Sequence, residues 1–217
     1  MTADHIAVIC RPVPGFRAFG DLAFPLFAFL LVEGFFHTRD RRRYGRRLLL
    51  AAVVSEIPYD LAFSGQWMDA QHQNVCLTFF LALVAMELLE RYGNGIWEKL
   101  VLTAVFCTLT EAAGADGGAW GMGMVLAFYF CVIGNSGTNV PRTILFHEKT
   151  VGVFMKMIAA VLIGAFVWQE PLWVLALTAV CLLLYDGSKG RSRFRSFFYI
   201  YYPAHLLALH FVGKWLG

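Results

Sequence analysis

Charged residues are scarce in this sequence. Only 15% of its 217 residues are Asp, Glu, Lys or Arg, whereas soluble domains contain about a quarter. Hydrophobic residues make up 59% of the chain, so a water-soluble fold would have too few polar side chains to cover its surface. The composition therefore excludes an ordinary soluble domain and indicates an integral membrane protein.

Clustered cysteines are also missing. The five cysteines are scattered singly, mostly within apolar stretches, with no CxxC pair and no metal-like spacing to histidine. We interpret them as small buried hydrophobic residues, and no spacing in the chain requires a metal. The net charge of +3 is modest, and nothing beyond it supports nucleic-acid binding.

Long apolar runs dominate instead. Eight of them approach the length of a span, at residues 16–36, 48–63, 75–89, 96–113, 119–133, 151–168, 172–185 and 197–215. Several are shorter than the roughly 20 residues that cross a bilayer, so flanking residues must complete them. Residues 1–10 are too short to span, and we interpret them as part of a longer helix or as a re-entrant element. The sequence predicts an all-α, polytopic bundle of about nine membrane segments, in one domain over residues 1–217.

Basic residues set the expected orientation, because Lys and Arg near span ends stay on the cytoplasmic side. Alternating spans place 15 of the 18 basic residues inside and leave Arg11, Arg17 and Lys214 outside. The loop expected after residues 16–36 carries six arginines: Arg39, Arg41, Arg42, Arg43, Arg46 and Arg47. They either only fix the orientation or also form a docking surface for an anionic cytoplasmic ligand, and both can hold at once.

Ionisable side chains inside the apolar runs are functional candidates, because lipid tolerates them only where they face the protein interior or water. Glu56 and Asp60 are four residues apart and share a helix face. Arg17, Asn74 and Asp116 lie near the same outer level. Pairing between helices explains any one of these residues. For the set, we favour a polar, partly hydrated cavity that opens outward.

Two histidines stand out within this set. His5 follows Asp4, a carboxylate that could orient an imidazole. His205 lies roughly 12 Å into the last run, at 1.5 Å per residue, and Pro203 precedes it. A neutral imidazole in a cavity can take the proton from an amine or hydroxyl that attacks an acyl carbon. The candidate catalytic residues are therefore the two histidines, His5 and His205, with the carboxylates Asp4 and Asp116.

Long strings of this sequence resemble the TraX family of membrane proteins, whose clan also contains multi-span acyltransferases that use acyl-coenzyme A. The matching strings are DHIAVI from Asp4, FRAFGDLAFPLFAFLLVEGFFHTRD over residues 16–40, SEIPYDLAF from Ser55, QNVCLTFFLAL from Gln73, ADGGAWG from Ala115, and YDGSKG with FFYIYYPAHLLAL towards the end. They run in order over essentially the whole chain. Where the family has an aromatic residue this chain has Gly117, which we expect to widen the outer cavity, and Asp21 stands where the family has a basic residue.

The resemblance implies transfer of an acetyl group from acetyl-coenzyme A, in the founding case to the amino terminus of a conjugative pilin. Its polar positions match these residues: Asp4, His5, Arg17, Glu33, Glu56, Asp60, Asn74, Asp116 and His205. We expect Arg17, Glu56, Asp60 and Asn74 to bind the acceptor. We expect Arg42, Arg46, Arg47 and Arg193 to pair with the phosphates of coenzyme A. The protein would lie in the bacterial cytoplasmic membrane, in contact with lipid.

Three functions stay open at this point. The first is the acetyltransferase, with a pilin-like protein, a sugar or a lipid-linked group as acceptor. The second is a proton- or ion-coupled transporter, in which the same intramembrane acids and histidines form a relay; the chain shows no internal repeat of the kind many transporters carry. The third is a non-catalytic factor for pilus or envelope assembly, which would tolerate replacement of His5 and His205.

Overall fold

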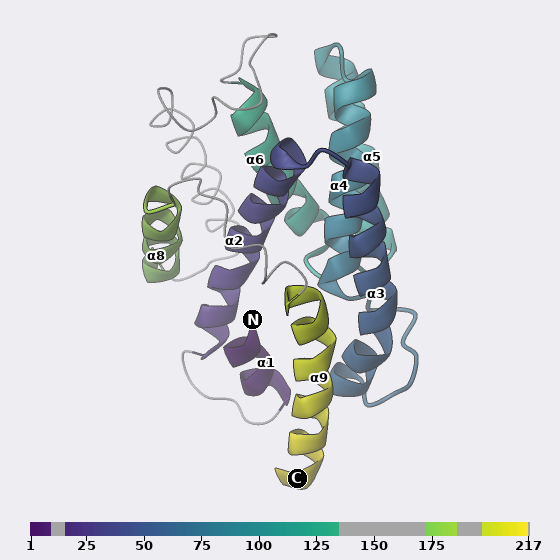
Figure 1. Cartoon of the computed structure of the whole chain (residues 1–217), viewed down its shortest axis with the longest axis vertical. Coiled ribbons are helices and arrows are strands. Elements are labelled where there is room, and N and C mark those ends of the chain that lie inside the picture. The colour runs from purple at the N-terminus through teal and green to yellow at the C-terminus, as the bar shows by residue number, and fades with distance from the viewer. Residues whose placement is uncertain (10–15, 135–171, 186–196, 217) are drawn as a thin grey trace.

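The computed structural model describes residues 1–9, 16–134, 172–185 and 197–216 (Figure 1). Within these residues the fold is all-α, as the sequence predicts, and the only β contact is one isolated bridge. The helices are α1 (Thr2–Ile9), α2 (Phe16–His37), α3 (Arg41–Phe63), α4 (Val75–Tyr92), α5 (Ile96–Ala112), α6 (Gly118–Gly134), α8 (Leu172–Leu183) and α9 (Phe197–Leu216). The expected run at residues 151–168 lies outside the described residues.

Helix α2 occupies the middle of the bundle (Figure 1). It packs against α1, α4, α6 and α8, whereas α3 packs against α4 and α9. The short helix α1 lies across the lower part of α2 and also contacts α9, so the first and last helices of the chain are neighbours. This closure brings residues about 200 positions apart in the sequence to one place.

The arginine-rich segment is helical rather than a loop, which corrects the sequence-based expectation. Helix α3 begins at Arg41, and the Asp40 side chain caps it by accepting a hydrogen bond from the Arg43 backbone N–H at 2.8 Å. A side-chain cap satisfies an orphan donor, and arginine is a good helix former. Two extra turns therefore precede the apolar part of α3.

A hydrophobic core lies between α2, α4 and α6. Phe35, Met86 and Phe128 have no exposed surface, and Tyr129 is almost as deeply buried. At its arginine-rich end the core is closed by Arg41, whose guanidinium lies 3.9 Å from the centroid of the Phe35 ring. Ion pairs from Arg41 to Glu87 and Glu90 on α4 hold it there, so this arginine is part of the helix packing.

The loops at the opposite end are joined across a short parallel bridge between Gln73 and Ala115. The Gln73 N–H donates to the Gly114 carbonyl, and the Asp116 N–H donates to the Gln73 carbonyl, both at 2.8 Å. Gly114 has a φ of +62°, and a Cβ there would lie 1.9 Å from the Gln71 carbonyl oxygen. Glycine is therefore required for the two loops to meet.

Apolar side chains are also found on the outside of the bundle. One face of α3 exposes Leu50, Val53, Val54 and Ile57, and one face of α5 exposes Ile96, Trp97, Leu100, Val101 and Val105. When length and hydropathy are considered together, none of the helices in the described ranges qualifies as a membrane span.

Candidate active site

A cavity of about 580 Å³ lies between α1, α2, α3, α4 and α9. Its wall is mostly apolar, and it follows α2 from Gly20 to Leu31, a distance of about 16 Å at 1.5 Å per residue. It is therefore long and narrow. Small-molecule sites commonly have this volume and this largely apolar lining with a few polar groups.

Two histidines meet at one end of the cavity. The Nδ1 atom of His5, on α1, lies 2.9 Å from Nε2 of His205, on α9, and the two rings are within 6° of parallel. Both side chains are buried, and His5 lines the cavity wall. The structure thus brings together the two histidines that sequence reasoning had singled out separately.

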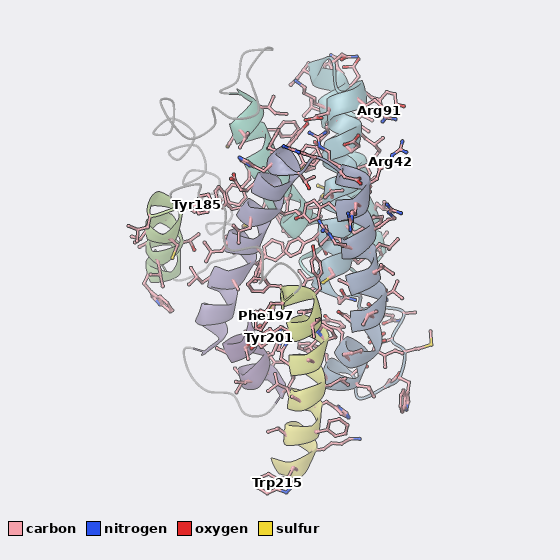
Figure 2. The ribbon with its side chains drawn as sticks, viewed as in Figure 1. Arg42, Arg91, Tyr185, Phe197, Tyr201 and Trp215 are labelled. Carbon is pink, nitrogen blue, oxygen red and sulfur yellow. The ribbon has the colours of Figure 1, made fainter. Side chains whose placement is uncertain are left out.

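The register of α9 explains where His205 lies. Phe197, Tyr201 and His205 are spaced four residues apart and stack as a ladder, with centroid distances of 5.3 Å and 5.0 Å. Figure 2 shows the first two rings near the start of α9. The Tyr201 hydroxyl is also hydrogen-bonded to Thr2 Oγ1 at 2.8 Å, which fastens α1 to α9. Side chains four apart are neighbours on a helix, so the ladder follows from the spacing.

Asp4 and Asp116 line the same end of the cavity. Asp4 fits only because residue 20 is glycine: a Cβ there would lie 2.1 Å from Asp4 Cβ. Asp116 follows the Gln73–Ala115 bridge in the loop before α6. Burial raises the pKa of the Asp116 carboxyl; the Gly117 N–H opposes this shift, and the nearby Asp4 carboxylate adds to it. Two close carboxylates in an apolar cavity favour a cation or a shared proton.

Arg47 lies beside the other end of the cavity; its side chain is exposed and is not itself among the lining residues. Tyr44 and Tyr199 form the wall there. The Arg47 guanidinium lies 5.8 Å from the centroid of the Tyr44 ring, and its charge acts on the Tyr199 phenol. A guanidinium and two phenols could hold an anion or a polar linker at this mouth. The tyrosines were not singled out from the sequence, because nothing in their spacing distinguishes them from interfacial aromatics.

The other expected coenzyme A residues are placed differently. Like Arg47, Arg42 and Arg46 are exposed and are not among the residues that line the cavity, but only Arg47 lies over a tyrosine of its wall. Figure 2 shows Arg42 near Arg91 on the outer side of the bundle, at the end where α3 begins. Arg42 and Arg91 thus lie at one end of the bundle. The alternation of spans predicts this for basic residues that follow the first and the third of the apolar runs. Arg193 lies outside the described residues.

The residues expected to bind the acceptor form a separate cluster beside the cavity. The Asn74 side chain accepts a hydrogen bond from the Cys76 N–H, which caps α4, and donates to the Ala52 carbonyl and the Glu56 carboxylate. One Asp60 oxygen accepts from the Asp69 N–H at 2.8 Å, whereas Asp60 Oδ1 and Glu56 Oε1 are buried without a partner. None of the three lines the cavity. Arg17 is the second residue of α2, and its side chain lies outside the described part.

Phe24 lies against the two glycines Gly117 and Gly121. A Cβ on Gly117 would lie 3.1 Å from the Phe24 ring, and one on Gly121 would lie 2.7 Å from it. Phe24 also lines the cavity. We expected Gly117 to widen the outer cavity. The Phe24 ring fills the space next to this glycine instead.

Further polar residues lie near the arginine-rich end. The Glu33 carboxylate accepts a hydrogen bond from the Tyr185 hydroxyl at 3.2 Å and lies 3.2 Å from His37 Nδ1. These contacts join the end of α2 to Tyr185, the second residue after α8, which Figure 2 shows beside that helix. Glu33 is not among the residues that line the cavity. In the part of the chain that is described, no group of three or more His, Cys, Asp and Glu side chains is arranged to hold a metal ion.

Comparison with known proteins supplies the family. Residues 1–213 match the family described as TraX protein. The chain is also 30% identical over 228 residues to the probable fimbrial assembly protein FimC, serogroup H1, of Dichelobacter nodosus. That match covers 96% of this chain and 89% of the relative. No solved structure matches. From the first helix to the last, this chain belongs to the TraX protein family.

Proposed function

We propose that this protein is a membrane acyltransferase that moves an acetyl group from cytoplasmic acetyl-coenzyme A to an amine or hydroxyl acceptor. One observation carries the proposal: one long cavity is lined at one end by His5, which contacts His205, and at the other by Tyr44 and Tyr199, beside which Arg47 lies. The arginine would bind the acyl donor at its polar part, and the pantetheine arm would follow the apolar wall towards His5. TraX family membership supports the acetyl group.

The chemistry at the histidine end is acyl transfer assisted by a general base. The acceptor nitrogen or oxygen attacks the thioester carbonyl, and the His5 imidazole takes the acceptor's proton. A bond forms between the carbonyl carbon and the acceptor, the carbon–sulfur bond breaks, and the coenzyme A thiolate leaves. The imidazolium then returns the proton to the thiolate. Asp4 and Asp116 would bind an acceptor amine in its cationic form and take its first proton, and His5 would take the second as the amine attacks.

The location in the bilayer rests on the outer faces of α3 and α5. Their exposed side chains recur every three to four residues, as on a lipid-facing helix. Exposed tryptophans also lie at helix ends: Trp97 is at the start of α5, and Figure 2 shows Trp215 at the opposite end of the bundle from Arg91. Aromatic residues prefer the two membrane interfaces. We place the protein in the bacterial cytoplasmic membrane as a multi-pass protein.

The proposed acceptor, a pilin-type protein, is taken from the name of the relative. The name of the Dichelobacter nodosus protein refers to fimbrial assembly, which supports a pilin-type acceptor over a sugar or a lipid-linked group. The same name favours a second candidate function, a non-catalytic assembly factor. The two differ in one respect: an assembly factor needs its helix surfaces but not the His5 imidazole.

The test is binding and turnover of radiolabelled acetyl-coenzyme A by the purified full chain in detergent. Wild type is compared with Arg47→Ala and with Arg46→Ala, the adjacent arginine, which does not lie over Tyr44, as the matched control. We expect saturable binding that is lost in Arg47→Ala and kept in Arg46→Ala, and slow hydrolysis or transfer that is lost in His5→Ala. If wild type fails to bind even at millimolar ligand, the acyltransferase proposal is wrong.

A further inference from the structure

The His5–His205 contact fixes where the protons of both rings lie. His205 Nδ1 is 2.9 Å from the backbone carbonyl of Tyr201. A carbonyl oxygen only accepts hydrogen bonds, so His205 Nδ1 carries a proton. A neutral imidazole has one N–H, which makes His205 Nε2 an acceptor.

The proton on His5 follows from this assignment. His205 Nε2 lies 2.9 Å from His5 Nδ1, and an acceptor needs a donor opposite it, so His5 Nδ1 carries the proton. His5 Nε2 then has a free lone pair. Within the described residues, the His5–His205 bond is the one hydrogen bond of the His5 side chain. A base must present such a lone pair to its substrate.

Packing holds His205 firmly in this role. Its ring is stacked on Tyr201 with 8° between the planes, and Tyr201 is tied to Thr2 on α1. The backbone carbonyl that orients His205 belongs to the same tyrosine. His5 lines the cavity, and His205 is not among the lining residues. His205 can therefore reach the cavity chemistry only through His5.

We propose that His205 is a positioning residue that locks His5 in the Nδ1–H tautomer and so directs the His5 Nε2 lone pair to the acceptor. This inference rests on the proposed acyl transfer. When His5 Nε2 takes the acceptor's proton, the His5 Nδ1 proton stays in place and its hydrogen bond to His205 strengthens. The positioning role needs no transfer of this proton to His205 Nε2, which acts only as the hydrogen-bond acceptor. The carboxylate neighbour Asp4, which the sequence suggested for this orienting role, is replaced in it by His205.

The test compares two substitutions at position 205 in the full chain. His205→Gln keeps an oxygen that can accept from His5 Nδ1–H, whereas His205→Phe keeps a stacked ring without an acceptor. We expect kcat to fall about 10- to 100-fold in His205→Phe, part of the 10²- to 10⁴-fold that a general base supplies. His205→Gln recovers most of that loss. The KM for acetyl-coenzyme A stays unchanged in both. His210→Phe, at the other buried histidine of α9, is the matched control and keeps wild-type kcat.

A second readout needs no turnover. Nitrogen-15 NMR of histidine-labelled protein distinguishes protonated from bare imidazole nitrogens. We expect His5 Nδ1 to be protonated in wild type and in His205→Gln, and the Nε2–H form to appear in His205→Phe. A His5 tautomer that does not change in His205→Phe would overturn the positioning role. If wild type shows the expected tautomers but transfers no acetyl group, the proposed function fails while the lock stands.

Discussion

Asn74 donates a hydrogen bond from its side-chain amide to the Glu56 carboxylate, and this contact fastens the first turn of α4 to the middle of α3. The same amide reaches the Ala52 carbonyl at 2.8 Å, and the amide oxygen caps α4. One fully buried side chain thus satisfies groups from two helices.

Asn74→Ala is expected to lower the free energy of unfolding by about 2–3 kcal/mol. The loss of a helix cap costs about 1 kcal/mol, and a buried carboxylate without its donor adds about 1–2 kcal/mol. Chemical unfolding of the detergent-purified variants measures the change. Asn94→Ala, in the exposed turn between α4 and α5, is the control and should stay within about 0.5 kcal/mol of wild type. Equal effects of the two would contradict the structural role of Asn74.

Arg41 and Arg42 should differ although they are neighbours. Arg41 pairs with Glu87 and Glu90 and lies over the Phe35 ring, whereas Arg42 is exposed and forms no ion pair with the described acidic residues. Arg41→Ala should cost about 1–2 kcal/mol, because a partly exposed ion pair and a cation–π contact each contribute about 0.5–1 kcal/mol. Arg42→Ala should change stability by less than about 0.5 kcal/mol. Thermal unfolding of the Arg41→Ala and Arg42→Ala variants at low and high salt tests this difference. We expect salt to change the unfolding temperature more in Arg42→Ala, because that protein retains Arg41 and its ion pairs.

Gly121→Ala is expected to push Phe24 into the cavity, because the new Cβ would lie 2.7 Å from the Phe24 ring. Overpacking of this kind costs about 1–3 kcal/mol. The double variant Gly121→Ala with Phe24→Leu should recover much of that loss, since a shorter side chain leaves room. Gly123→Ala is the control: nothing lies within 4 Å of its Cβ, and alanine favours the helix. The measurement is the unfolding midpoint of wild type, Gly121→Ala, the double variant and Gly123→Ala. If Gly121→Ala is as stable as Gly123→Ala, the contact between residue 121 and Phe24 is refuted.

The loop before α4 should lose stability in acid through Asp69. The Gln71 backbone N–H, and then His72, lower the pKa of the Asp69 carboxyl from its ordinary value of 3.8. A carboxylate with a lowered folded-state pKa stabilises the fold above its ordinary pKa, and the contribution disappears as pH falls through the lowered value. Asp69→Asn should therefore be less stable than wild type at neutral pH and should approach it in strong acid. Unfolding measured across that range tests this, and a difference that does not vary with pH would show that the Asp69 charge has no role.

Much of the helical architecture could be predicted from hydropathy, because each described helix contains one of the apolar runs or, for α1, the short opening segment. The start of α3 could not. Six arginines in a row of nine residues suggest a solvated loop, and the signal that overrides them is a single capping aspartate, Asp40. Composition averages over a window, whereas a cap acts at one position.

The site was less accessible to sequence reasoning. His5 was chosen for its carboxylate neighbour Asp4 and His205 for its depth in the last apolar run, but nothing in the sequence states that the first and last helices are neighbours. The choice between Arg46 and Arg47 has a similar cause: adjacent residues on a helix point about 100° apart, so only Arg47 lies over Tyr44, a residue of the cavity wall. Glu56, Asp60 and Asn74 have the residue types of a binding site, and the contacts of Asn74 and Glu56 hold helices together.

The Gln73–Ala115 bridge also bears on how the chain assembles. The chain between the two bridged residues contains α4 and α5, and backbone hydrogen bonds join its two ends into a closed loop. Closing a loop of this length is paid for in chain entropy, and the bridge can form only after both helices have returned to the same side. The α4–α5 hairpin is therefore a natural unit of folding, and the amides of Gln73 and Asp116 should become protected from hydrogen exchange only when that unit is complete.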